Sequence, residues 1–200
     1  MTRTRLRTAG AATALTLALL LTGCAGQSGT DAGSAPAASA DAAGVNETDV
    51  WFAQMMIVHH EGAVEMAELA VEDATTDEVR ELAERIRDAQ GPEIELMQGW
   101  LDAWGEPEPA GMDHGGMDHG GMDMEGMDQQ EAMASLEGLD GLDVDRSFLD
   151  LMIAHHRGAV EMSEVELADG SDPAALDLAE QIIEDQEAEI AEMEDLLRGL

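Results

Sequence analysis

The feature that most constrains this chain is an internal repeat with a spacing of 96 residues. Segment 49–66 reads DVWFAQMMIVHHEGAVEM, and segment 145–162 reads DRSFLDLMIAHHRGAVEM. Twelve of the twenty-two residues in 49–70 are identical to their counterparts, and the same spacing, without a gap, continues to match residues between 82 and 97. Chance does not produce such agreement, so the chain carries a duplicated unit of about fifty-five residues.

The first unit is predicted to form a helical hairpin. Thr48 is positioned to cap a helix over about 49–73, and Thr76 or Asp77 to begin a second helix over about 77–103. Both segments have apolar residues at helical spacing, so each helix is expected to pack through one face.

The second unit repeats this order. Asp143 or Asp145 begins a helix that runs to about residue 168. In Gly170-Ser171-Asp172-Pro173, a helix stop, a cap and a first-turn proline follow one another, and they begin a last helix that ends near residue 198.

Strand signals are absent, so the predicted fold class is all-α. Four amphipathic helices in two antiparallel pairs pack naturally as a four-helix bundle, which predicts one domain over residues 47–200. A long connection over about 105–142 returns the chain so that the second pair can pack on the first.

The N-terminal segment is typical of a bacterial secretion signal. Residues 11–21 form an apolar run that is too short to span a bilayer as a mature helix, and it follows a basic region made of Arg3, Arg5 and Arg7. The run ends in Leu21-Thr22-Gly23-Cys24, which resembles the lipobox of bacterial lipoproteins.

This resemblance implies that residues 1–23 are removed and that lipid is attached to the sulfur of Cys24. Residues 24–46 are rich in Ala, Gly, Ser and Asp and predict a disordered tether. The mature chain is therefore expected outside the cytoplasm, anchored to the membrane by its lipid. The alternative, an ordinary secretory signal with a chance cysteine, leads to the same side of the membrane.

The charge balance excludes several classes of partner. The formal net charge is -35, and after residue 23 only six arginines remain against 44 acidic residues. Such a surface repels phosphate backbones and anionic headgroups, which argues against nucleic-acid binding and polybasic membrane docking. With one cysteine, no internal disulfide and no thiolate metal cluster can form.

Histidine and methionine lie together on the first helix of each unit. Phe52, Met56, His59, Ala63 and Met66 form one stripe at 100° per residue, with His60 just off its edge. The copy repeats the stripe with Phe148, Met152, His155, Ala159 and Met162, and it places His156 as the first unit places His60.

Polar residues interrupt the apolar face of the second helix in each unit. Gln90 and Glu93 lie within the face made by Leu82, Ile86, Met97 and Leu101, and Gln186 and Glu189 repeat this in the copy. Polar groups on a packing face need partners, and the facing imidazoles are the obvious candidates.

The pattern Met-x-x-His-His-x5-Met, found twice, brings thioether and imidazole donors to one helix face. These neutral donors suit copper, particularly Cu(I), better than magnesium or calcium. The competing interpretation is that the methionines fill a core and the histidines are hydrogen-bonded core residues. Two copies, with no other histidine in the predicted helices, favour a metal site.

The connection between the units supplies further soft donors. Its glycine-rich sequence cannot build a core, so burial does not explain its methionines. These candidate auxiliary ligands are Met112, His114, Met117, His119, Met122, Met124 and Met127. A low-complexity segment without function is the alternative.

The two Met-Ile-x-His-His-x-Gly-Ala-Val-Glu-Met segments, with the later Gln-x-x-Glu-Ile-x-x-Met spacing, resemble the domain of unknown function 305 family over about 47–104 and 143–199. The resemblance implies a secreted or lipid-anchored protein with a ferritin-like four-helix fold, in a family with some members linked to copper binding and tolerance. The ligands that it implies are Met56, His59, His60, Met66, Met152, His155, His156 and Met162. One departure between the two copies is Glu61 against Arg157.

Two enzymatic alternatives find little support. A di-iron oxidase needs Glu-x-x-His pairs, and no histidine of this chain has glutamate three residues before it. A hydrolase lacks a nucleophile-elbow motif. The sequence therefore predicts a membrane-anchored copper-binding protein without a catalytic cycle, which sequesters or transfers the metal and whose protein partner is unknown. A metal-free interaction module of the cell envelope is the alternative.

Overall fold

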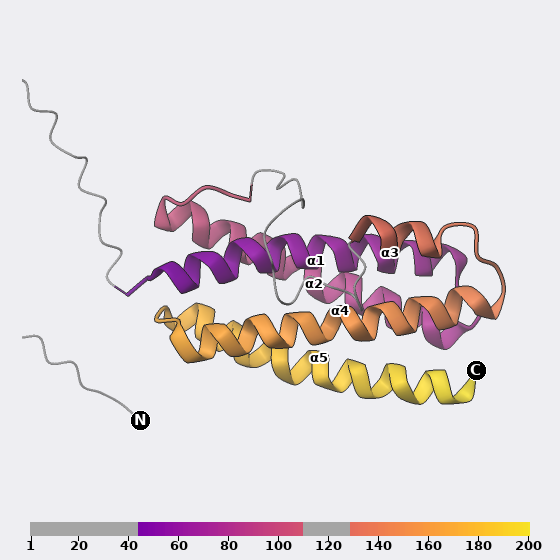
Figure 1. Cartoon of the computed structure of the whole chain (residues 1–200). Helices are drawn as coiled ribbons and strands as arrows, with labels where there is room; N and C mark the ends of the chain where they lie inside the picture. Colours follow the sequence, from indigo (N-terminus) through magenta and orange to yellow (C-terminus); the bar gives the residue numbers. More distant parts are fainter. Residues whose placement is uncertain (1–43, 110–128) are drawn as a thin grey trace, which may run out of the picture. The chain divides into compact units, whose positions relative to one another are not determined.

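The computed structural model describes residues 44–109 and 129–200, and within these ranges it contains helices and no strand (Figure 1). This part of the chain is all-α, as predicted. The predicted signal peptide, nearly all of the predicted tether and the connection residues 110–128 lie outside the described residues. The helices are α1 Glu47–Asp73, α2 Asp77–Trp104, α3 Gln129–Leu136, α4 Leu142–Asp169 and α5 Pro173–Gly199.

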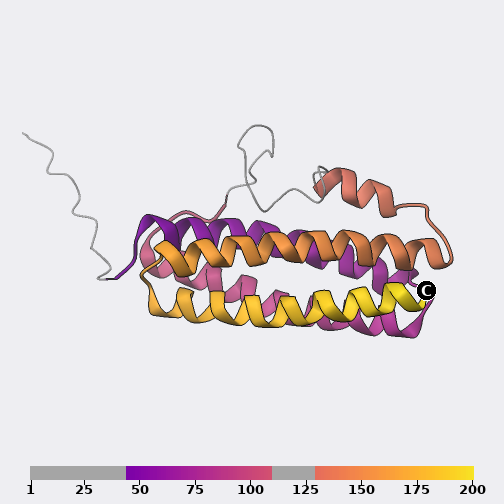
Figure 2. The same cartoon turned by 60° about the horizontal axis from the view of Figure 1, so that its bottom comes forward.

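Each repeat forms one hairpin, since α1 packs along α2 and α4 packs along α5. The hairpins meet through α1 and α4, which run in opposite directions and lie side by side (Figure 1, Figure 2). Only the equivalent residues near the middle of the two helices can therefore face each other across the α1–α4 contact.

The start of α1 differs from the prediction that Thr48 is its cap. Asn46 is the N-cap, and its side chain accepts hydrogen bonds from the backbone N–H groups of Thr48 and Asp49. The Asp49 carboxylate accepts the Asn46 N–H in return, which completes a capping box. Asparagine with aspartate three residues later satisfies three backbone donors, whereas Thr48 already lies inside the helix.

The other predicted helix starts agree with the structure to within a few residues. Asp172 caps α5 through the N–H groups of Ala174 and Ala175, with Pro173 in the first turn. Thr76 is the N-cap of α2 but makes no side-chain capping bond. The helix α4 begins at Leu142, earlier than predicted, and its N-cap Gly141 has a φ of 63°.

The helix α3 was not predicted, because it lies in the segment interpreted as a connection. It is short, and it buries Ala132 and Leu136 in the same apolar cluster as residues of α1 and α4. Two apolar residues four positions apart are too few for a periodic signal, so packing on the long helices rather than local sequence accounts for this helix.

The central helices α1 and α4 are buried on more than the one predicted stripe. Met55, Ile57 and His60 are buried together with the stripe residues of α1, because this helix contacts both α2 and α4. By contrast, α2 and α5 bury a single face, which includes Gln90 and Gln186.

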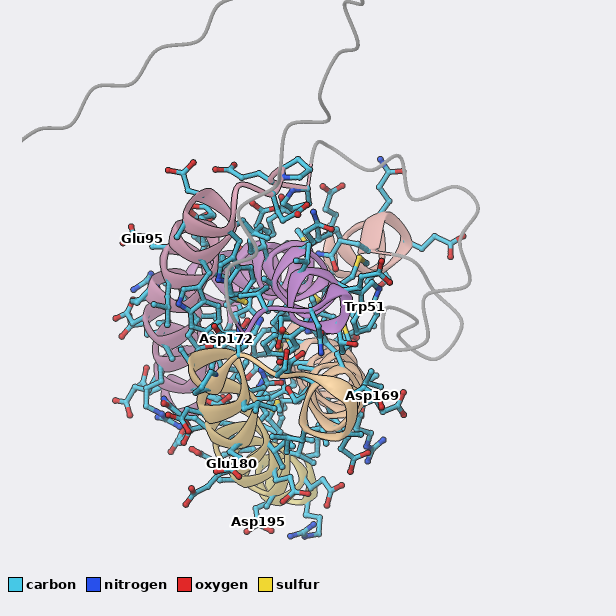
Figure 3. The ribbon with its side chains drawn as sticks, turned by 90° about the vertical axis from the view of Figure 1, so that its left-hand side faces the viewer. Trp51, Glu95, Asp169, Asp172, Glu180 and Asp195 are labelled. Atoms are coloured by element: carbon cyan, nitrogen blue, oxygen red, sulfur yellow. The ribbon has the colours of Figure 1, made fainter. Side chains whose placement is uncertain are left out.

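Acidic side chains cover the outer faces of the helices. Figure 3 shows Glu95, Glu180 and Asp195 pointing away from the ribbon, and all three are exposed. Among the described residues, no helix is both apolar enough and long enough to cross a membrane.

Candidate metal centre

The centre of the α1–α4 contact is a pair of equivalent histidines, one from each repeat. The ring centroids of His59 and His155 lie 3.6 Å apart, and the ring planes are tilted by 39°. His59 is 3% exposed and His155 is 4% exposed. The antiparallel packing of two copies of one motif therefore brings imidazoles that are 96 positions apart in sequence into contact.

The two remaining helical histidines turn toward the second helix of their own hairpin. Nε2 of His60 lies 2.7 Å from Oε2 of Glu93, and Nε2 of His156 lies 2.7 Å from Oε2 of Glu189. The predicted contact between the imidazoles and these glutamates is thus present in both repeats.

Gln90 and Gln186 do not find the imidazole partners that were expected. Both side chains are buried, and the Oε1 atom of each has no hydrogen-bond partner within the described ranges. Each amide oxygen is therefore a buried polar atom without a hydrogen-bond partner in the described ranges. It lies about one helical turn before the glutamate of the same helix that contacts a histidine.

The environment of His155 favours a neutral imidazole. Burial first, and then the three neighbouring histidines, hold the pKa of His155 well below its ordinary value. A neutral ring keeps a nitrogen lone pair for a cation at physiological pH.

The four motif methionines are completely or almost completely buried, with exposures of 0% to 1%. Met56 and Met162 belong to one apolar cluster, and Met66 and Met152 belong to the other. Because α1 and α4 are antiparallel, each cluster receives one methionine of each type, and the two clusters lie on either side of the His59–His155 pair.

The donor set fits a soft cation better than a hard one. Of the described residues, no group of three or more His, Cys, Asp or Glu side chains is arranged to hold a metal ion, so neither a zinc site of His and Cys ligands nor a carboxylate cage for calcium is present there. The Nδ1 atoms of His60, His155 and His156 are buried and lack a hydrogen-bond partner in this part of the chain. Imidazole nitrogen and thioether sulfur are the donors that suit Cu(I).

Loading the central pair with one ion requires movement. Imidazole–metal bonds are about 2 Å long, so two imidazoles on opposite sides of one ion have ring centroids roughly 6 Å apart. The observed separation of 3.6 Å is shorter. His59 and His155 must therefore separate or rotate before both can bind the same ion.

Sequence reasoning missed the two residues that align the hairpins. The buried carboxylate of Asp145 accepts the N–H groups of Thr75 and Thr76, which connect α1 to α2. Asp49 accepts the N–H groups of Ser171 and Asp172 in the equivalent turn of the other hairpin. The signal was available, because aspartate occupies the same position in both copies of the repeat.

Both described ends of the connection are attached to α1. The Gln54 side chain donates to the carbonyl oxygen of Pro107, and the Gln129 side chain donates to that of Gly62. A Cβ atom at Gly62 would lie 2.6 Å from Oε1 of Gln129, so glycine allows this close approach. The predicted auxiliary ligands at 112–127 and the predicted lipidation site, Cys24, lie outside the described residues.

The chain is similar to known proteins in sequence and in fold. The sequence model of the family described as "Domain of unknown function (DUF305)" matches residues 49–197. A DUF305 fragment from Deinococcus radiodurans has 33% identity and a TM-score of 0.68, and the alignment covers 78% of this chain and 99% of that one. A DUF305 protein from Streptomyces coelicolor has 36% identity and a TM-score of 0.67, with 76% and 91% covered.

A third similar structure is CopM in its Cu(I)-bound form. It has 29% identity and a TM-score of 0.63, and the alignment covers 77% of this chain and 98% of CopM. CopM structures in Cu(II)-bound and Ag-bound forms are also similar to this chain. No curated protein sequence matches it.

Proposed function

Because the chain belongs to the DUF305 family, we propose that it binds copper, preferentially as Cu(I), at a site shared by its two repeats. The four long helices serve as a scaffold of the ferritin-like type. The helix ligands are His59, His155 and the surrounding motif residues, and the protein sequesters the metal or transfers it without a catalytic cycle.

The observation that carries this proposal is the contact between His59 and His155. Two equivalent imidazoles meet at a buried contact, and the four buried motif thioethers lie in the apolar clusters on either side of it. An ordinary core would gain more from aliphatic side chains at these positions, because burying a polar imidazole costs free energy that an aliphatic side chain does not.

Similarity to CopM supports the choice of metal. The CopM structures contain Cu(I), Cu(II) or Ag, and silver is a chemical substitute for Cu(I). Thioether donors favour the monovalent ion, which is the reason for preferring Cu(I) here.

The location of the protein follows from its N-terminal sequence. Lipid on Cys24 would hold the chain at the outer side of the cell membrane. The Met- and His-rich connection would then add weaker auxiliary binding beside the helix site, and its aspartates would attract cations.

A metal-free interaction module of the cell envelope remains a second candidate. The complete burial of the motif methionines in apolar clusters favours it, because methionine packs well in cores whether or not a metal binds.

A competition titration with a chromogenic Cu(I) chelator tests the proposal. The His59→Ala plus His155→Ala variant is expected to lose the tight phase of Cu(I) binding and to keep a weaker phase. The matched control, His114→Ala plus His119→Ala in the connection, is expected to keep the tight phase.

Two results would contradict the proposal. Tight Cu(I) binding by the His59 and His155 variant would exclude a shared helix site. Absence of Cu(I) and Ag(I) binding by the unaltered chain would favour the metal-free module.

A further inference from the structure

The two histidines that face α2 and α5 share one geometry. In each repeat a fully buried imidazole contacts a glutamate 33 positions later in the sequence, through Nε2 and Oε2, at 2.7 Å. The contact occurs at equivalent positions in both copies, His60 with Glu93 and His156 with Glu189. Two independent occurrences with the same atoms indicate a built feature of the hairpin.

This geometry determines which ring nitrogen carries the proton. An ionised carboxylate can only accept hydrogen bonds, so the Nε2 atom that faces it must donate. In a neutral imidazole the lone pair then lies on Nδ1. The Nδ1 atoms of His60 and His156 are buried, and no hydrogen-bond donor or acceptor among the described residues satisfies them.

The carboxylates are well placed to orient the rings at low cost. The side chains of Glu93 and Glu189 are 17% and 21% exposed, whereas those of the two histidines are fully buried. The carboxylates therefore keep contact with water while they bind a buried ring, and the charge avoids most of the desolvation penalty.

We propose that Glu93 and Glu189 are positioning residues that hold His60 and His156 in the Nε2–H tautomer, so that these imidazoles bind the soft cation through Nδ1. This inference rests on the proposed function and specifies the donor atoms within it. A carboxylate behind an imidazole also increases the basicity of the ligating nitrogen. A cation at Nδ1 would satisfy the buried lone pair that the described residues leave without a partner.

The tautomer can be measured without metal. Long-range proton–nitrogen correlation spectra of the 15N-labelled, metal-free chain are expected to show His60 and His156 as Nε2–H tautomers, with assignments from single histidine variants. The Glu93→Leu plus Glu189→Leu variant is expected to show mixed tautomers. The Glu93→Gln plus Glu189→Gln variant keeps an acceptor oxygen and is expected to restore the Nε2–H form.

Silver titration of the same samples tests the donor atom, since Ag(I) is redox-inert. In the unaltered chain, Ag(I) is expected to shift the Nδ1 resonances of His60 and His156. The dissociation constant of the leucine variant is expected to rise by about 10–100-fold. The matched control is Glu95→Leu plus Glu187→Leu, two exposed carboxylates on the same helices, which is expected to bind as the unaltered chain does.

The outcomes separate this inference from the proposed function. An Nδ1–H tautomer in the metal-free chain, or Ag(I) binding that shifts Nε2 instead, overturns the positioning role while copper binding stands. An unchanged tautomer and affinity in the leucine variant, with its helicity intact by circular dichroism, also overturns it. Absence of any Ag(I) binding by the unaltered chain overturns the proposed function and, with it, the ligation by Nδ1.

Discussion

At the end of its first helix, the first hairpin has alanine at position 70, whereas the second has glutamate at the equivalent position 166. The residue four positions later differs as well, with Ala74 in the first hairpin and Gly170 in the second. A Cβ atom at Gly170 would lie 2.3 Å from Oε1 of Glu166, so glycine makes room for the buried carboxyl. The two substitutions are thus coupled sterically.

The histidine motif and the start of the first helix show the opposite behaviour in each hairpin. Both keep the histidine pair and the glutamate that contacts its second member. Both also keep the aspartate that binds the turn of the other hairpin. Since the repeats differ widely elsewhere, the comparison separates contacts that both halves need from local adjustments at one end.

The largest expected effect comes from the two shared aspartates. Asp145→Ala and Asp49→Ala each remove a buried carboxylate that accepts at least two backbone N–H groups. Each is expected to lower the free energy of unfolding by roughly 3–5 kcal/mol, because charge-assisted bonds to buried donors are lost. Urea denaturation measures this.

The exposed Asp143→Ala serves as the control for these aspartates and is expected to change stability by less than about 0.5 kcal/mol. If Asp49→Ala and Asp145→Ala are as mild as the control, the idea that equivalent carboxylates align the two hairpins is wrong.

A smaller effect is expected from the residue that breaks the symmetry. Burial first, and then interaction with Asp49 and the charge of Asp172, raise the pKa of Glu166 from 4.5 to about 8. Burial acts to raise the pKa of Asp49 too, but N–H donors from Asp172, Asn46 and Ser171 outweigh it and lower that pKa. The pair therefore consists of a protonated Glu166 and an ionised Asp49.

The sign of the pH dependence follows from this pair. Above its ordinary pKa, Glu166 loses its proton in the unfolded chain but keeps it in the folded one, so its contribution to stability falls as pH rises from about 4.5 to about 8. Glu166→Gln is expected to remove roughly 2–4 kcal/mol of this decline. Urea titrations across that pH range compare the two proteins, and parallel profiles would contradict the assignment.

The smallest effect is expected at the charge difference between the repeats. Arg157 lies 3.3 Å from Glu194, and both side chains are about half exposed. Exchanging the charges with Glu61→Arg plus Arg157→Glu is expected to change the free energy of unfolding by less than about 1 kcal/mol, because exposed ion pairs contribute little. A larger change in the free energy of unfolding, measured by thermal unfolding, would mean that Glu61 or Arg157 makes contacts beyond those of an exposed ion pair.

Several elements were predictable because their signals are local. The proline after Asp172 and the helical spacing of apolar residues located the long helices to within a few residues. The cap of α1 was predicted at Thr48 instead of Asn46, since any small polar residue near a helix start gives a similar signal. Helix α3 was missed, because its stability comes from contacts with α1 and α4.

The partners of the candidate ligands were only partly predictable. Residue types and spacing identified the histidines and the polar positions facing them, and Glu93 and Glu189 do contact imidazoles. The same reasoning gave Gln90 and Gln186 the same role, but helical periodicity cannot distinguish neighbours one turn apart that share a face.

The sequence alone determines the duplication, the all-α class and the presence of soft donors on one helix face. Each of these depends on composition or on spacing along the chain. The direction in which the two copies pack was decided only by the tertiary structure. Antiparallel contact of α1 with α4 places His59 against His155. This outcome depends on how two buried surfaces fit together, and no pattern within a single helix contains that information.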